Sequence, residues 1–208
     1  MLLIGRAFYP QGEQKKAAEE LRHALIERYL GREGNAVLFR AENGRPMLTI
    51  PGADISTTHS HGLVMVALSF PDALVSLQKK ELPEGIEIEE YPESFCRVGI
   101  DTELLTDEDC KKYRKIAARW FCTDEQDLLA AIEQENLYRE TFFRIWTQKE
   151  SVCKLTGKGI PAIREVDTLA LSEEITVRSR LLTTQNGDYI CTFCGETDCH
   201  TDLPADAP

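Results

Sequence analysis

Apolar residues recur along the chain with two different periods, which together predict a mixture of strands and helices. Short apolar runs at 2–9 and 63–68 are typical of buried strands, and 85–91 alternates apolar with acidic residues as a half-buried strand does. An apolar stripe at helical spacing runs through 13–30, and a long helix is expected from about 136 to 154. Both kinds of element therefore occur in each half of the chain.

Helix and turn signals place further elements in the second half. Residues 106–109 form a helix-start signal, and Thr123 with Gln126 has the pattern of a capping box for a second short helix. The turn at 185–188 predicts a C-terminal hairpin within 163–193. Because each half holds a helix and a small sheet, the pattern predicts an α+β fold and favours an internal duplication, although no residue-level repeat is visible.

The charge and the cysteine usage narrow the class of protein. The 208 residues carry a net charge of −11, which argues against a nucleic-acid partner because nucleic-acid-binding domains are normally basic. No apolar run approaches the roughly 20 residues that span a membrane. Seven cysteines in an odd, scattered set, after an N-terminus that lacks the pattern of a signal peptide, favour reduced thiols. We therefore expect a cytoplasmic protein that binds neither nucleic acid nor membrane.

Two carboxylates and a charged helix end are the candidates for chemistry. Asp101 and Glu103 follow an apolar approach and share one face of an extended segment, where they repel each other unless a cation lies between them. Trp146, Glu150 and Lys154, spaced i, i+4, i+8, share one side of the long helix. A metal and a phosphate would suit these charges. Each segment taken alone is also compatible with ordinary solvated surface charge.

Two other polar segments leave alternatives open. Residues 56–61 hold hydroxyls and imidazoles that can bond phosphate oxygens, or form a polar turn that bonds its own backbone. Cys191, Cys194 and Cys199 with His200 look like zinc ligands. Strand alternation would direct the first two to opposite faces, so inert thiols are the favoured interpretation, and a zinc-stabilised interaction module is the weaker one.

Five motifs in this order resemble the 4′-phosphopantetheinyl transferases, specifically the larger, pseudo-dimeric type that activates surfactin synthetase. They are Gly44-Arg45-Pro46, Thr58-His59-Ser60, Gly99-Ile100-Asp101-Thr102-Glu103, Arg119-Trp120-Phe121 leading to Glu125, and Trp146-x-x-Lys149-Glu150-x-x-x-Lys154 with Gly157-x-Gly159. The third and fifth are specific in combination, whereas either alone would be weak. The motifs span about residues 44 to 160.

The resemblance implies a fold, a reaction and partners. It implies two similar α/β lobes related by a pseudo-twofold axis, with a coenzyme A-binding lobe at 1–96 and a lobe carrying the metal and catalytic motifs at 97–208. Coenzyme A would lie between the lobes of a monomer. The reaction would be Mg²⁺-dependent transfer of 4′-phosphopantetheine to a serine of an apo acyl or peptidyl carrier protein, releasing adenosine 3′,5′-bisphosphate.

The resemblance also assigns roles to residues. Asp101, Glu103 and Glu150 would hold Mg²⁺, and the catalytic pair would be Glu150 as base and Lys154 as the cation facing developing charge. The coenzyme A ligands would be Arg45, Thr58, His59, Lys149 and Lys154. A different functional class stays open, in which a degenerate member holds coenzyme A or a carrier without turnover.

The chain departs from the family pattern at three places. His61-Gly62 follows Ser60 where the family usually has glycine at once, and 70–95 separates motifs that normally lie close together. The N-terminal basic segment is short. The basic run 111–115 is the candidate surface for docking an acidic carrier.

Overall fold

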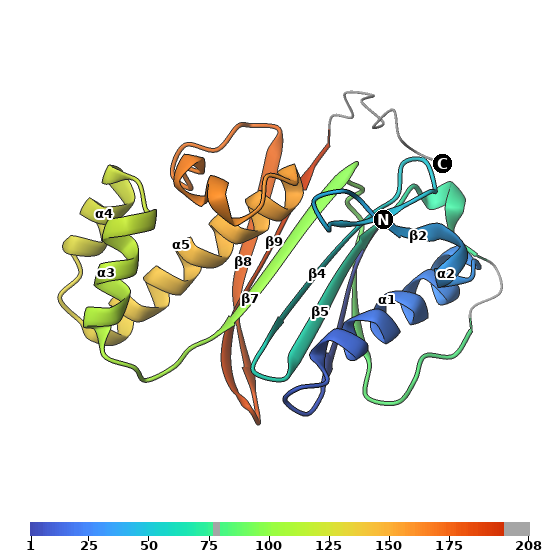
Figure 1. Cartoon of the computed structure of the whole chain (residues 1–208), viewed down its shortest axis with the longest axis horizontal. Helices are drawn as coiled ribbons and strands as arrows, with labels where there is room; N and C mark the ends of the chain where they lie inside the picture. The colour runs from blue at the N-terminus through green and yellow to red at the C-terminus, as the bar shows by residue number, and fades with distance from the viewer. Residues whose placement is uncertain (77–79, 198–208) are drawn as a thin grey trace.

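Two antiparallel sheets form the centre of the computed structural model, which describes residues 1–76 and 80–197 (Figure 1). The first sheet has the order β4 (Asp54–Ser60), β5 (Leu63–Ser69), β1 (Leu2–Phe8) and β6 (Glu87–Tyr91). The second has the order β7 (Arg97–Leu104), β9 (Gly187–Glu196) and β8 (Ile175–Thr184). A separate two-stranded ribbon pairs β2 (Leu38–Arg40) with β3 (Pro46–Leu48).

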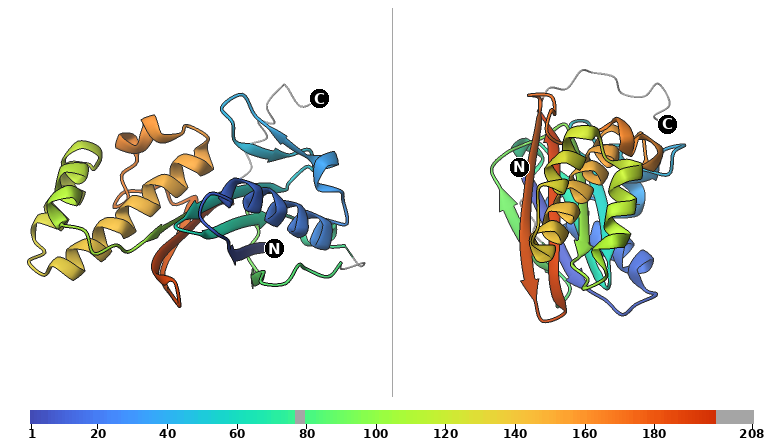
Figure 2. Two further views of the ribbon diagram at one scale, coloured as in Figure 1. Left: turned by 60° about the horizontal axis from the view of Figure 1, so that its bottom comes forward. Right: turned by 90° about the vertical axis from the view of Figure 1, so that its left-hand side faces the viewer.

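The helices divide between the two sheets. Helix α1 (Gln14–Leu30) and the short α2 (Gly34–Val37) belong to the first half, and α3 (Cys110–Trp120), α4 (Thr123–Ala130) and α5 (Glu135–Thr156) to the second. Two 3₁₀ turns, η1 (Asp72–Leu74) and η2 (Ile160–Glu165), complete the described elements. Figure 2 shows that α1 covers the first sheet and that the β2–β3 ribbon stands beside this helix.

Helix α1 follows the apolar stripe read from the sequence. Leu21 and Leu25 have no exposed surface and pack with Ile55 and Val66 of the first sheet. The helix ends where Gly31 takes a left-handed conformation with φ 60°, which glycine adopts without a steric penalty.

Helix α5 lies unusually close to β7 because of Gly99. A Cβ atom at this position would fall 1.9 Å from the carbonyl oxygen of Ser151, so only glycine lets the helix backbone rest on the strand. Thr147 of the helix is fully buried, and its hydroxyl is 2.8 Å from that of Thr192 in β9. The helix is thereby fixed against the second sheet next to Asp101.

The facing surfaces of the two sheets share an apolar core. Leu2, Ile4 and Met65 of the first sheet pack with Ile100 and Tyr189 of the second. All five are at most 2% exposed. Burial of such side chains contributes roughly 1.5–3 kcal/mol each, so this core is a main source of cohesion between the sheets.

A ladder of side chains joins β4 to β7 at one edge of this core. The Val98 N–H donates to Asp54 Oδ2 at 2.8 Å, the Ile100 N–H to Ser56 Oγ at 3.2 Å, and the Leu104 N–H to Ser60 Oγ at 3.3 Å. The two residues of each pair are 44 positions apart in the sequence, so β4 and β7 run in the same direction with a constant register. We refer to these contacts as the β4–β7 ladder.

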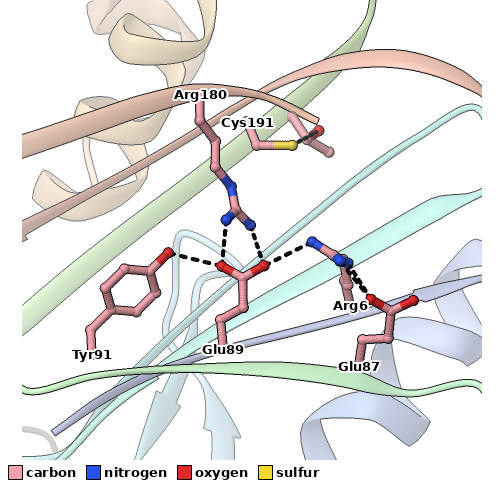
Figure 3. Close-up of polar contacts among 7 residues, drawn as sticks. Arg6, Glu87, Glu89, Tyr91, Arg180 and Cys191 are labelled. Carbon is pink, nitrogen blue, oxygen red and sulfur yellow. Dashed lines mark hydrogen bonds and ion pairs between the residues drawn. The ribbon is translucent and has the colours of Figure 1, made fainter. Parts of the chain in front are cut away.

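Ion pairs join the sheets at the opposite edge, between β6 and β8 (Figure 3). Glu89 accepts hydrogen bonds from both terminal nitrogens of Arg180, from Arg6 and from the Tyr91 hydroxyl. The pKa of Glu89 lies below its usual value: burial acts to raise it, but the bonds from Arg180 and Tyr91 outweigh burial. Strand β6 comes from the 70–95 segment, which thus supplies an edge strand of the first sheet.

The predicted mixture of helices and strands is confirmed, with local corrections. The capping box of α4 is one residue earlier than predicted, because the Cys122 N–H donates to the Glu125 carboxylate at 3.0 Å. Residues 163–174 are not a strand but contain part of η2 and turns. His61 and Gly62, with φ 45° and 90°, form the tight turn between β4 and β5. None of the described helices is long and apolar enough to cross a membrane.

Replacing Gly99 with alanine should test the close contact between α5 and β7. The added methyl group meets backbone, which cannot move aside, so we expect a loss of about 3 kcal/mol or more in the free energy of unfolding measured with urea. Gly5→Ala is the matched control, because its methyl group meets only side-chain ends, those of Leu25 at 2.9 Å and Leu21 at 3.4 Å, and no backbone. Equal losses in the two variants would contradict this view of the packing.

Candidate functional site

Asp101 lies at the centre of a polar cluster between β4, β7 and α5. It is 2% exposed, and its Oδ1 accepts from the Thr58 hydroxyl at 2.9 Å and from Lys154 Nζ at 2.7 Å. Its second oxygen, Oδ2, is buried and has no hydrogen-bond partner among the described residues. A buried carboxylate oxygen without a partner is costly, so this atom indicates a position for a further cationic or donor group.

Two more acids border Asp101. Burial and, secondarily, the charge of Asp101 raise the pKa of Glu103 to about 7, although the Ser60 hydroxyl donates to it at 2.9 Å. The same two causes raise the pKa of Glu150 to about 8, against the opposing charge of Lys154. Three acids that disfavour each other's ionisation form a site that is electrostatically incomplete without added positive charge.

Helix α5 supplies the other side of the cluster. Glu150 and Lys154 are one turn apart, as their spacing predicts, and Lys154 Nζ also donates to the Ile100 carbonyl at 3.0 Å. The Lys154 side chain is 31% exposed, so its ammonium group contacts both Asp101 and solvent. Trp146, a turn earlier, stacks on Phe121 and Phe142 and serves the packing of α5.

The donor set fits a hard divalent cation. Carboxylate oxygens are the ligands that Mg²⁺ prefers, and the unpartnered Asp101 Oδ2 is one such oxygen. The three acids do not bring their oxygens within 4.8 Å of one another. In the described part of the chain, the one trio of potential ligands whose donor atoms lie within that distance is the Cys122 sulfur with carboxylate oxygens of Glu125 and Asp167. Mg²⁺ usually keeps several waters, which a wider cluster accommodates.

The structure corrects the expectation that Lys149 faces a phosphate. Lys149 has no exposed surface, and its Nζ lies 2.7 Å from Glu125, which is equally buried. The ammonium group also donates to the backbone carbonyls of Ile163 and Val166. Lys149 lies about 100° around the helix from Glu150, and that rotation directs it into the contact with α4 and η2 instead of the acid cluster.

The buried pair also excludes a metal at the Cys122, Glu125 and Asp167 trio. Burial acts to raise the pKa of Glu125, but hydrogen bonds from Lys149 and Thr168 outweigh it and hold the pKa below its usual value. The two Glu125 oxygens are already bonded by Lys149, Cys122 N–H and Thr168. This carboxylate is therefore structural.

The three residues expected at the 3′-phosphate of coenzyme A do not come together. Thr58 faces β7 and donates to Asp101, whereas His59, the next residue of β4, is exposed on the opposite face. Arg45 forms an ion pair with Asp54 and donates to the Val98 carbonyl at 3.3 Å. Arg45 and Thr58 thus hold the junction of the two sheets.

Reasoning from the sequence missed the roles of Ser60 and Glu125. The signal for Ser60 was present, because Asp54, Ser56, Thr58 and Ser60 alternate at the strand period. These polar residues face another strand and not solvent, which alternation alone does not reveal. For Glu125, no feature of the sequence distinguishes a partner of Lys149 from an ordinary helix-start acid.

The structure tests the prediction that Cys191 and Cys194 point to opposite faces of their strand. Cys191 is buried in the core between the sheets, and Cys194 packs on the other face with Val152 and Leu155. The two thiols point to opposite faces, as predicted, and cannot share a metal. Cys199 and His200 lie outside the described residues.

Removing the Lys149 ammonium group should destabilise the fold. Lys149→Met leaves the Glu125 carboxylate buried without its cation, which typically costs about 3–5 kcal/mol in the free energy of unfolding. Adding Glu125→Leu should recover part of this loss in a double-mutant cycle. Lys158→Met, in an exposed ion pair with Glu165, is the control and should change stability little. A Lys149→Met loss as small as that of the control would contradict the structural role.

Comparison with known proteins identifies the family. The sequence profile of the 4′-phosphopantetheinyl transferase superfamily matches residues 97–201. The chain is 32% identical to the 4′-phosphopantetheinyl transferase psf-1 of Bacillus pumilus over 165 residues, which are 77% of this chain and 57% of the relative. It is 26% identical to the 4′-phosphopantetheinyl transferase HetI of Nostoc sp. over 168 residues, 78% of this chain and 60% of the relative. The matches thus span somewhat under two thirds of each relative.

The profile begins at Arg97, the first residue of β7, and extends over Asp101, Glu103 and all of α5. The match therefore covers the strand and the helix that form the acid cluster. On this evidence the chain belongs to the 4′-phosphopantetheinyl transferase superfamily.

Proposed function

We propose that this protein transfers the 4′-phosphopantetheine group of coenzyme A to a serine of an apo acyl or peptidyl carrier protein, with Mg²⁺, and releases adenosine 3′,5′-bisphosphate. The observation that carries the proposal is the buried, unpartnered Asp101 Oδ2 beside Glu103, Glu150 and the Lys154 ammonium group. Attack on a pyrophosphate requires neutralised charge, a deprotonated nucleophile and an oriented leaving group.

Each residue of the cluster has a proposed role. Asp101, Glu103 and Glu150 would hold Mg²⁺, which when bound would offset the negative charge of the pyrophosphate. Lys154, partly exposed and bonded to Asp101, would stabilise the charge that develops on the leaving group. Glu150 would accept the serine proton, directly or through a water.

The architecture supports a division into two lobes. The proposed boundary at 96/97 separates the strands of the first sheet from those of the second, and each sheet carries one long helix, α1 or α5. A pseudo-twofold relation between the two halves, with coenzyme A between them, remains part of the proposal. So do the monomeric state and the cytoplasmic location.

A carrier protein would be the macromolecular partner. Helix α3 exposes Lys111, Lys112, Arg114 and Lys115, which suits the acidic surface of a carrier domain. Two of these cations are already paired, Lys112 with Glu108 at 2.5 Å and Lys111 with Asp109 at 3.8 Å. Arg114 lies 4.2 Å from the centre of the Tyr138 ring, so Lys115 has the greatest freedom to meet a partner.

A binding protein without turnover is the second candidate. The presence of all three acids, Asp101, Glu103 and Glu150, weighs against it, because clustered carboxylates repel an anion in a site that only binds one. The two candidates differ in one observable, the Mg²⁺-dependent release of adenosine 3′,5′-bisphosphate.

Asp101→Asn should abolish transfer and leave the fold intact. The amide keeps the shape of the side chain but removes its charge, so we expect labelling of a carrier to fall by at least about 100-fold. The assay would present labelled coenzyme A with apo carriers from fatty-acid, peptide and polyketide systems. Asp127→Asn, an exposed acid of α4, is the control. Labelling by Asp101→Asn at the wild-type rate would refute the assignment.

Stability should depend on pH and Mg²⁺ in a way that tests the metal site without measuring activity. Glu103 and Glu150 bind protons more tightly in the folded chain, with pKa values of about 7 and 8, than in the unfolded chain. Without metal, their contribution to stability should be full below about pH 4 and be lost as pH rises towards 8.

Mg²⁺ competes with these protons, so it should raise the melting temperature more at pH 8 than at pH 6. Glu150→Gln should show a smaller loss of stability with rising pH and a smaller response to Mg²⁺. The metal assignment would be wrong if Mg²⁺ did not alter the wild-type melting temperature at pH 8.

A further inference from the structure

The turn between β4 and β5 connects His61 to the acid cluster through one side chain. His61 Nδ1 lies 3.0 Å from Ser60 Oγ, and the same hydroxyl donates to Glu103 Oε2 at 2.9 Å. Ser60 is 7% exposed, whereas His61 lies at the surface. A row of polar atoms therefore runs from the surface turn to the Glu103 carboxylate, and the roles proposed above do not use His61.

Glu103 depends on a single donor for its orientation. Asp101 accepts from both the Thr58 hydroxyl and Lys154 Nζ. Within the described residues, the hydrogen bonds of the Glu103 carboxylate reduce to the one from Ser60. A glutamate side chain has several rotatable bonds, so this one hydrogen bond decides where its oxygen atoms lie.

The β4–β7 ladder alone does not account for the Ser60 hydroxyl. Its bond from the Leu104 N–H is 3.3 Å long, which is beyond the usual range for such bonds, whereas its bond to Glu103 is 2.9 Å long. Ser56 makes the equivalent ladder contact, with the Ile100 N–H at 3.2 Å. The shorter bond of Ser60 is thus the one that it makes to the acid.

The single proton of the Ser60 hydroxyl fixes the direction of each of its bonds. A hydroxyl donates once and accepts with two lone pairs. When Glu103 is ionised, as a ligand of a cation must be, it can only accept, so it takes the Ser60 proton. The Leu104 N–H uses one lone pair, and His61 Nδ1 must carry a hydrogen and donate to the other. In this arrangement Ser60 has no acceptor that competes with Glu103.

The backbone of His61 brings its ring to Ser60. In a regular strand, the side chains of neighbouring residues point to opposite faces. At φ 45°, His61 leaves the strand, and its ring contacts Ser60. The Tyr189 hydroxyl donates to the His61 carbonyl at 3.2 Å, and the Tyr9 N–H to the Gly62 carbonyl at 2.8 Å, so the turn is held in place. Glycine would adopt this φ at a lower cost, so an imidazole here indicates a use for the side chain.

We propose that Ser60 and His61 are positioning residues for the cation site, in which His61 fixes the Ser60 hydroxyl and Ser60 holds the Glu103 carboxylate in place. The inference rests on the metal ligands assigned in the proposed function. Neither residue contacts the cation or a substrate, and both act through Glu103. Outer partners of this kind orient the ligands of a metal, and their loss typically lowers metal affinity by about 10- to 100-fold.

Binding of Mn²⁺, which accepts the same carboxylate ligands as Mg²⁺, tests this role when the free ion is counted from its electron paramagnetic resonance signal. Ser60→Ala should weaken Mn²⁺ binding at least about tenfold. Ser60→Thr keeps the hydroxyl on a residue suited to a strand, so its affinity should lie within about threefold of the wild-type value. Ser56→Ala is the matched control, because it removes a ladder hydroxyl that has no acid among its described partners. Its affinity should also lie within about threefold of the wild-type value.

His61→Gly separates the positioning role from a role in the turn. The variant should melt no lower than the wild-type protein, because glycine adopts φ 45° without a steric penalty. It should nevertheless bind Mn²⁺ about threefold more weakly, as expected for the loss of one hydrogen bond. A residue that served only the turn would not lower the affinity while the melting temperature held.

Mn²⁺ binding decides this inference, and transfer to a carrier decides the proposed function. If Ser60→Ala binds Mn²⁺ as tightly as Ser56→Ala, Ser60 has no positioning role, whatever the rate of transfer. If His61→Gly keeps the wild-type affinity, His61 is not part of the arrangement. This variant decides the inference if Ser60→Ala does not fold. A wild-type protein that binds no Mn²⁺ overturns the inference even where transfer is observed. If the expected order of affinities is found without any transfer, the inference stands and the proposed function fails.

Discussion

The β4–β7 ladder is the constraint on which the arrangement of the site depends. Strand β7 has a row of backbone N–H groups that no strand of the first sheet pairs, and Asp54, Ser56 and Ser60 accept from them with their side chains. Because buried N–H groups need acceptors, the polar character of β4 is a structural requirement. The two-residue period of the ladder also aligns Thr58 with Asp101 and Ser60 with Glu103, so the register that holds the sheets together also builds the acid cluster.

Two lysines of one helix show how a motif divides between structure and chemistry. Lys149 and Lys154 lie in the same short motif. Lys149 forms a fully buried ion pair with Glu125, whereas Lys154 contacts Asp101 and is partly exposed to solvent. The buried pair ties α5 to the start of α4. It thereby fixes the rotation of α5 that presents Glu150 and Lys154 to β7. One short motif of this chain therefore contains both residues of the acid cluster and the buried lysine whose packing orients them.

The parts of the fold that follow from local pattern could be predicted, and those set by long-range partners could not. Strands β1 and β5 and helices α1 and α5 have strong apolar periodicity, and their positions agree with the structure to within about two residues. Strand β4 did not stand out, because the partners that satisfy its polar side chains lie 44 residues away. The spacing of α5 placed Glu150 and Lys154 together. It could not show which side of the helix buries Lys149, since Glu125 gives no local signal of its role.

The hydrogen bond from Thr58 to Asp101 has a consequence for how binding and cohesion are related. Asp101 belongs to one sheet and Thr58 to the other, so the oxygen atoms of the acid cluster are part of the contact between the two sheets. By linkage, a cation that binds Asp101 more tightly when the two sheets are docked stabilises their docking by the same free energy. A cation at Asp101 would thus bear on the contact between the two sheets as well as on the site itself.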